Sequence, residues 1–223
     1  MAKLEWDKIG ERLYETGVSR GVLYPASEGG AYANGVAWNG LTQVAENPSG
    51  AEATPMYADD VKYLNLMSAE EFGATIEAYT YPDEFAECDG SASVVAGVTL
   101  GQQPRKQFGF AYRTKIGNDT KGDNLGYKIH VVYNCQASPS GKTYGTVNET
   151  PEAITFSWEV TTTPVVIEGY KPTSTLVVDS TKVKPATIKA VEDKLYGTEE
   201  AQPTLPSLSE LIALIKQAES TGV

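Results

Sequence analysis

Three stretches of the chain alternate apolar and polar residues, and this period of two constrains the fold more than any other feature. They span residues 108–115, 127–134 and 154–160. Successive side chains of a β-strand point to opposite faces, so each stretch predicts a strand with one packed face. Loops rich in Gly, Asn, Asp, Ser and Pro separate them, which favours antiparallel strands that pack on one face and meet solvent on the other. The residues assigned to packed faces are Phe108, Phe110, Tyr112 and Thr114, then Tyr127, Ile129, Val131 and Tyr133, then Ile154, Phe156, Trp158 and Val160.

Weaker patterns add further strands and three helices. Residues 82–90 begin with Pro82 and end on Gly90, which indicates a short helix. A helix is expected over residues 185–196, ended by Gly197. Ser207 and Glu210 have the spacing of a capping box and predict a last helix through about Ala218. The other predicted strands cover residues 21–24, 36–38, 61–66, 72–81 and 173–179.

These elements predict a mainly β fold: an antiparallel β-sandwich or barrel with a flanking short helix, a long inter-strand loop and terminal arms. A chain of 223 residues can form this as one domain. We expect an N-terminal arm at residues 1–20, the β-domain at 21–180, and a C-terminal helical arm at 181–223. Glycines interrupt the first segment, and a proline-containing linker precedes the last helix.

Residues 46–60 are predicted to form the long polar loop. They contain two prolines, a glycine and four acidic residues, and no clear periodicity. A loop of this length within a compact domain is more often functional than idle.

Charge is unevenly distributed along the chain, whose formal net charge is −11. Residues 46–89 contain eleven acidic residues and one basic residue, Lys62, whereas residues 105–128 contain six basic residues and two acidic ones. These could be ordinary solvated faces. Alternatively, they are complementary surfaces that meet between copies of the chain.

The sequence offers little for catalysis or cofactor binding. His130 is the only histidine and falls on a predicted solvent-facing position, and Cys88 and Cys135 are expected to be free thiols. A zinc site therefore lacks credible ligands, and no phosphate-binding loop or nucleophile elbow is present. Adjacent carboxylates such as Glu70 and Glu71 are weak signals for a glycosidase. We expect a non-enzyme that uses no cofactor, lacks a membrane segment and is made in a cytoplasm.

Residues 49–64, SGAEATPMYADDVKYL, resemble the GAE-x-TP-x-YADN-x-KY core of siphophage major tail proteins. The stretches at residues 70–86, 113–119 and 151–159 look like the same group, so the resemblance covers about residues 40–164. It implies a tail tube protein of long non-contractile phage tails, located in the virion. Such proteins form hexameric rings that stack around a tape measure protein, end at tail terminator and distal tail proteins, and let double-stranded DNA pass without touching a membrane.

The resemblance directs attention to three groups of residues. The loop and the two termini are expected to join copies, acidic side chains to line a lumen that repels DNA phosphates, and basic side chains to meet acidic ones of a neighbour. The assembly candidates are Glu52, Thr54, Pro55, Met56, Tyr57, Asp59 and Asp60; the lumen candidates are Glu70, Glu71 and Glu77; the basic interface candidates are Arg105, Lys106, Arg113 and Lys115.

Two other classes of protein remain open from the sequence. A capsid decoration protein, or another structural virion protein, would share the acidic β-rich composition. A carbohydrate-binding module would use exposed aromatic side chains, for which the candidates are Tyr57, Tyr63, Tyr79 and Tyr81.

Overall fold

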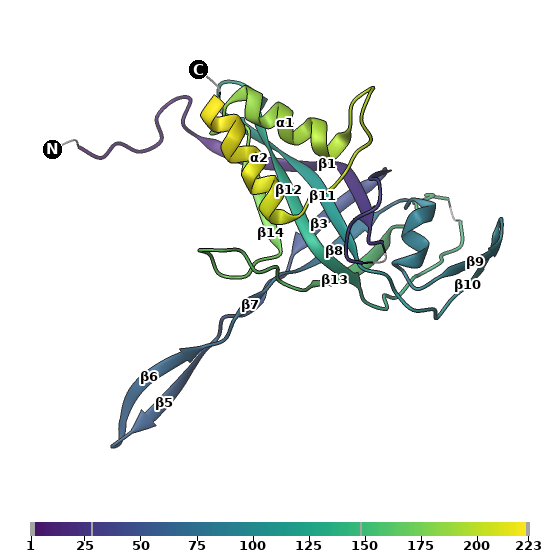
Figure 1. Cartoon of the computed structure of the whole chain (residues 1–223), viewed down its shortest axis with the longest axis horizontal. Helices are drawn as coiled ribbons and strands as arrows, with labels where there is room; N and C mark the ends of the chain where they lie inside the picture. The colour runs from purple at the N-terminus through teal and green to yellow at the C-terminus, as the bar shows by residue number, and fades with distance from the viewer. Residues whose placement is uncertain (1–2, 28, 148, 222–223) are drawn as a thin grey trace.

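The computed structural model describes residues 3–27, 29–147 and 149–221; Met1, Ala2, Glu28, Asn148, Gly222 and Val223, which include the ends of both predicted arms, lie outside the described residues. Most of the ordered elements are strands (Figure 1). The strands are β1 (Leu13–Pro25), β2 (Val36–Trp38), β3 (Leu41–Glu46), β4 (Ser49–Gly50), β5 (Ala53–Ala58), β6 (Val61–Met67), β7 (Glu70–Glu71), β8 (Gly73–Ala78), β9 (Ala92–Val95), β10 (Val98–Leu100), β11 (Phe108–Asn118), β12 (Gly122–Ala137), β13 (Phe156–Thr162) and β14 (Thr175–Asp179). The helices are the 3₁₀ helix η1 (Asp83–Glu87) and the α-helices α1 (Pro185–Tyr196) and α2 (Leu208–Thr221).

One large antiparallel sheet organises the molecule, which confirms the mainly β prediction. Its strand order is β2-β1-β11-β12-β13-β8-β3, and β14 also pairs with β12. Three two-stranded sheets, β4–β7, β5–β6 and β9–β10, lie outside it. The helices α1 and α2 lie together beside the long strands β11 and β12 (Figure 1).

The central strands are packed on both faces, so the expectation of one solvated face is wrong there. Directly opposed residues in an antiparallel pair share a face. Tyr112 opposes His130 and Arg113 opposes Ile129, so the apolar set of β11 and the apolar set of β12 point to opposite sides of the sheet. The alternation within β11 and within β12 was predicted correctly. Neither pattern alone, however, shows which residue of β11 opposes which residue of β12.

The first core is an aromatic cluster on the Tyr112 side of the sheet. The ring centroids of Trp38 and Trp158 lie 5.5 Å apart, and Phe85 of η1 lies 5.2 Å from Trp158. All three side chains are buried. The short helix predicted over residues 82–90 is the 3₁₀ helix η1, which places Phe85 in this aromatic cluster. Ile154, assigned to the packed face of its strand, lies before β13 and is exposed.

The second core lies under α1 and α2, so residues 181–221 are part of the body and not an arm. Val191, Leu195 and Leu211 are fully buried against the opposite face of the sheet. The Tyr24 hydroxyl also donates a hydrogen bond of 2.6 Å to the Leu195 carbonyl, which ties β1 to α1. The helices dock here because Ile129 and its neighbours leave an apolar face that must be covered.

The predicted N-terminal arm is also shorter than expected. β1 begins at Leu13 and pairs with β11 from Leu13 to Pro25, so residues 13–20 belong to the sheet. Residues 3–12 form neither helix nor strand. Gly10 is held by the β11–β12 turn, since Asn118 Nδ2 donates to its carbonyl at 2.8 Å and its amide donates to Asp119 at 3.0 Å.

The predicted loop at residues 46–60 is instead half of a long β-hairpin. β4 and β5 pair with β7 and β6, so the hairpin extends from residue 49 to residue 71. Asp59 and Asp60 form its two-residue turn with φ of 50° and 63°. Positive φ at both central positions marks the turn type whose twist suits a hairpin, and Asp tolerates that conformation. Pro55 is acceptable because each strand of a two-stranded sheet is an edge strand.

Candidate assembly surface

The hairpin of residues 49–71 projects from the body and exposes large apolar side chains (Figure 1). Every residue of β5 and β6 is exposed. Isolated two-stranded hairpins are marginal in water, and clustered exposed apolar side chains indicate a contact surface. The exposed apolar side chains are Met56, Tyr57, Val61, Tyr63, Leu64, Leu66 and Met67.

One face of the hairpin carries a contiguous apolar group. Met56 opposes Leu64 and Thr54 opposes Leu66, two residues away along the same strands. Because alternate pairs share a face, Met56, Leu64 and Leu66 lie together. The strand at residues 61–66 was predicted, but its part in this apolar face was not, because residues 46–60 were interpreted as a loop.

The structure brings the assembly candidates together on this one element. All seven are exposed, with Asp59 and Asp60 at the tip and Glu52 between β4 and β5. Over residues 49–71 the hairpin has five acidic residues and one basic residue, Lys62. It is therefore both apolar and acidic, which is a combination suited to a partner with an apolar, basic surface.

The root of the hairpin is fixed by a polar cluster around Glu46, the last residue of β3. The Tyr112 hydroxyl donates a hydrogen bond of 2.6 Å to Glu46 Oε1. His130 stacks on Tyr112 with ring centroids 4.6 Å apart, and its Nδ1 lies 3.6 Å from the same oxygen. His130 was expected on the surface, but its side chain is only 13% exposed; Tyr112 stacks on its ring and the Thr114 hydroxyl lies 3.0 Å from its Nε2.

Burial lowers the pKa of His130 below its usual 6.5, although Glu46 and Glu15 act in the opposite direction and Lys128 reinforces the lowering. A folded pKa below the unfolded one means that the unfolded chain binds the proton more readily. Stability from this group is therefore fully present above about pH 6.5 and is lost as the pH falls below it.

We expect the free energy of unfolding to decrease between pH 7 and pH 5, with His130 as a contributor. In His130→Gln this decrease should be smaller, as measured by urea unfolding at both pH values. The carboxyl groups whose pKa is lowered by hydrogen bonds or ion pairs, such as Asp123 and Asp179, titrate at lower pH and are unchanged in the variant. An identical pH dependence in both proteins would contradict the assignment to His130.

The three lumen candidates do not form one group. Glu70 and Glu71 lie exposed in the hairpin stem, on β7. Glu77 is half-buried on β8, on the face opposite Ile76 and the core. The strand predicted over residues 72–81 is confirmed for residues 73–78, whereas the position of these acids relative to a lumen stays a prediction.

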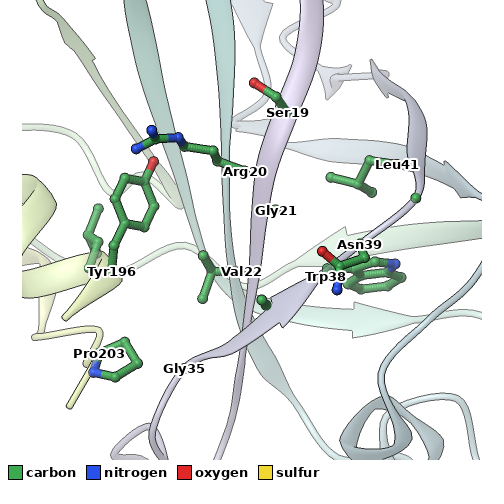
Figure 2. A pocket seen from close by; sticks show the side chains of 13 residues that line it. Ser19, Arg20, Gly21, Val22, Gly35, Trp38, Asn39, Leu41, Tyr196 and Pro203 are labelled. Carbon is green, nitrogen blue, oxygen red and sulfur yellow. The ribbon is translucent and has the colours of Figure 1, made fainter. Parts of the chain in front are cut away.

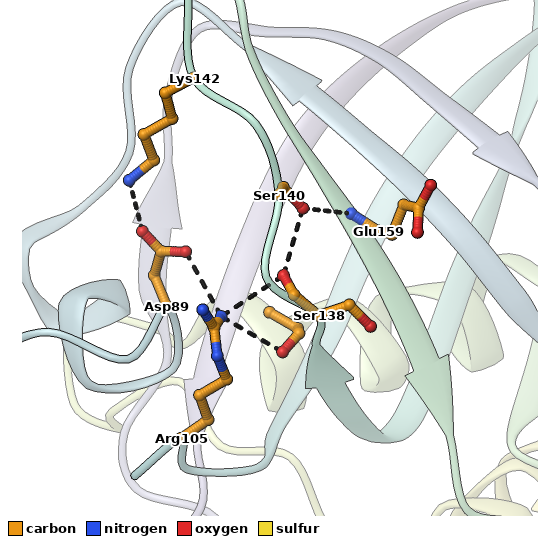
Figure 3. Close-up of polar contacts among 7 residues, drawn as sticks. Asp89, Arg105, Ser138, Ser140, Lys142 and Glu159 are labelled. Carbon is orange, nitrogen blue, oxygen red and sulfur yellow. Dashed lines mark hydrogen bonds and ion pairs between the residues drawn. The ribbon is translucent and has the colours of Figure 1, made fainter. Parts of the chain in front are cut away.

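The basic candidates are divided between two places and have partners within the subunit. Arg105 Nη1 lies 3.6 Å from Asp89, whose side chain is only 8% exposed and also pairs with Lys142 at 2.5 Å. Figure 3 shows this cluster, in which Arg105 also donates to the Ser138 carbonyl at 3.4 Å. Lys106 pairs with Glu87 at 2.6 Å.

The other two basic candidates lie on β11. Arg113 stacks over the Tyr127 ring at 4.6 Å, and Lys115 pairs with Asp123 at 2.6 Å. These four residues thus do not form one basic patch. A contact between the acidic and basic stretches of different copies stays a prediction, and charges already paired within the subunit would add little to it.

A cavity of about 630 Å³ lies between β1, β2 and the end of α1 (Figure 2). Arg20 and Tyr196 line it, with the guanidinium 5.7 Å from the ring centroid. Its lining includes no acid, histidine or cysteine. Among the described residues no cluster of three metal-ligating side chains occurs, and no helix is long and apolar enough to cross a membrane.

The aromatic candidates for sugar binding are dispersed. Tyr57 and Tyr63 are exposed on the hairpin, and Tyr79 is exposed beyond β8. Tyr81 packs edge-on against Trp158 in the first core, with centroids 5.4 Å apart. Tyr81 therefore stabilises the fold, and the four rings do not make one platform.

No protein-family profile and no curated protein matches the chain. Among solved structures, the chain is similar to a protein of the sheath-tube complex of the PVC extracellular contractile injection system in its extended state, with a TM-score of 0.31 and 12% identity, covering 72% of this chain and 88% of that one. It is also similar to a protein of the anti-feeding prophage cap, which terminates a tube, with a TM-score of 0.32 and 10% identity, covering 81% of this chain and 97% of that one. Function therefore has to be inferred from the site itself.

Proposed function

We propose that this protein is the tail tube subunit of a long non-contractile phage tail. Copies close into six-membered rings, and the rings stack into a tube. The observation that carries this proposal is the projecting hairpin: the residues that resemble the siphophage motif, 49–64, form β4, β5 and the start of β6. A projection with so many exposed apolar side chains is costly for a monomer and useful for a subunit that must bind its neighbours.

The proposed partners follow from this role. The tube surrounds a tape measure protein, ends at tail terminator and distal tail proteins, and conducts double-stranded DNA. An acidic inner wall would repel phosphates, since each phosphate bound by Lys or Arg slows passage. Glu70, Glu71 and Glu77 are the wall candidates. A reconstruction of assembled tubes with these side chains on the outer surface would exclude them.

We expect the purified full-length chain to form rings or tubes as its concentration is raised, visible by negative-stain electron microscopy with sixfold end views. A head-to-tail contact closes into rings or grows into filaments, so sixfold end views and stacking distinguish a tube subunit from a decoration protein, which would give discrete trimers that do not stack. Persistent monomers at high concentration would overturn the proposal. A monomer that binds polysaccharide would favour the carbohydrate-binding alternative.

A further inference from the structure

An apolar groove of about 680 Å³ lies on the body between α2 and β14. α2 contributes Leu208, Ile212 and Ile215, and β14 contributes Leu176 and Val178. Such a groove, lined by a helix on one side and a sheet edge on the other, can accept the side chains of an added segment.

The strand that borders this groove has a free edge. β14 pairs with β12 along one side, and no strand of residues 3–27, 29–147 or 149–221 pairs with its other side. An open edge presents unpaired N–H and C=O groups, which are a template for a strand of another chain.

We infer that this groove and the adjoining edge of β14 receive the hairpin of residues 49–71 from a second copy of the chain. The inference rests on the proposed function in that both require self-association, but it names the receiving surface. One open edge of the hairpin adds to β14. The apolar group of Met56, Leu64 and Leu66 then packs into the groove against α2.

Charge favours the hairpin over the exposed N-terminal segment. Lys171, Lys182 and Lys216 line the groove, with Asp179 as its single acid. Lys182 pairs with Asp179 at 3.5 Å, so the attraction comes from the remaining net positive charge, carried by Lys171 and Lys216. The hairpin opposes these with five acidic residues and one lysine. By contrast, the exposed N-terminal segment, residues 3–12, has three acidic and three basic residues, so its net charge offers no attraction.

The contact is intermolecular and repeats. The hairpin points away from its own body, as Figure 1 shows, and all side chains of β5 and β6 are exposed. Each copy therefore presents one hairpin and one groove on different surfaces. Such a head-to-tail contact leaves an unused hairpin at one end and an unused groove at the other. Further copies add at these ends until a ring closes or a filament grows.

Charge-reversal variants test the contact between the hairpin and the groove. The triple variant Lys171→Glu, Lys182→Glu and Lys216→Glu should raise the concentration needed for assembly at least tenfold, because it replaces several attractions with repulsions. Adding Glu52→Lys and Glu70→Lys, which are exposed hairpin positions outside the strained turn, to that variant should restore part of the loss. The matched control reverses three exposed lysines outside the groove: Lys3, Lys121 and Lys189. Equal effects of the two triple variants would overturn the proposed contact.

Cysteine cross-linking separates this inference from the proposed function. Full-length Met56→Cys mixed with full-length Ile215→Cys should give a disulfide-linked heterodimer on oxidation, since the native thiols of Cys88 and Cys135 are buried. Tubes without this cross-link would refute the groove while leaving the tube function intact. Cross-linked dimers without tubes would support the groove and contradict the tube. A cross-link of Ile215→Cys to Trp6→Cys in place of the hairpin would assign the groove to the N-terminal segment.

Discussion

Shortening the hairpin should abolish self-assembly and leave the subunit folded. Gly50 and Glu70 are directly opposed in the stem. Residues 51–69 can therefore be replaced by Asn-Gly, a two-residue turn that closes such a pair. The removed segment includes no buried residue. We expect circular dichroism and thermal unfolding to match the parent closely, while sedimentation velocity shows monomers at concentrations where the parent forms tubes.

The second exposed hairpin provides a matched control for this deletion. β9–β10 also projects from the body (Figure 1) and exposes Val94, Val95, Val98 and Leu100. Replacing its tip with Asn-Gly removes apolar surface without touching the hairpin of residues 49–71. If the β9–β10 variant assembles and the variant that lacks residues 51–69 does not, the contact between copies lies in the hairpin of residues 49–71. Normal tubes from the first variant would contradict the role of the hairpin.

Local signals predicted most of the elements correctly. α1 begins at Pro185 and ends before Gly197, as expected from a proline in the first turn and a glycine that adopts φ of 78°. Glu210 accepts a hydrogen bond of 2.9 Å from the Ser207 amide, so the predicted capping box opens α2. These features depend on single residues or on residues three positions apart, which a sequence displays directly.

Features that depend on pairing between distant residues could not be predicted. The apolar residues of β11 and β12 could lie on the same face of the sheet or on opposite faces. Which arrangement occurs depends on the residue that opposes Tyr112, and the register of the whole sheet determines that residue. The covered second face in turn determined that α1 and α2 belong to the body. For the same reason, the partners of Arg105 could not be read from its place in a basic stretch.

The hairpin was misassigned for a more local reason. Prolines, acids and a glycine at residues 46–60 suggested an irregular loop, because strand patterns usually show one apolar face and few such residues. A free hairpin buries neither face within the subunit, so no apolar alternation is needed for packing on its own core. Only the Asp59-Asp60 turn signalled that the chain reverses there.

The same substitution, Leu→Ala, should have different effects at a buried site and at an exposed site. At the buried site it should lower stability, and at the exposed site it should weaken assembly. Leu211 on α2 is fully buried, whereas Leu66 on the hairpin is 54% exposed. Leu211→Ala should lower the free energy of unfolding by about 2–5 kcal/mol, because it leaves a cavity in the second core. Leu66→Ala should change it by no more than about 0.5 kcal/mol. Chemical denaturation of both variants measures these values.

Assembly should respond in the opposite order. Leu66→Ala removes part of the apolar face that the hairpin offers to a neighbour, so the concentration needed for tube formation should rise. Leu211→Ala leaves that face and the hairpin unchanged, and below its lowered unfolding temperature it should still assemble. If Leu211→Ala instead unfolded no more readily than the parent, α2 would not be part of the core. If Leu66→Ala assembled like the parent, the apolar face of the hairpin would not be the contact, and the affinity would have to come from its charges alone.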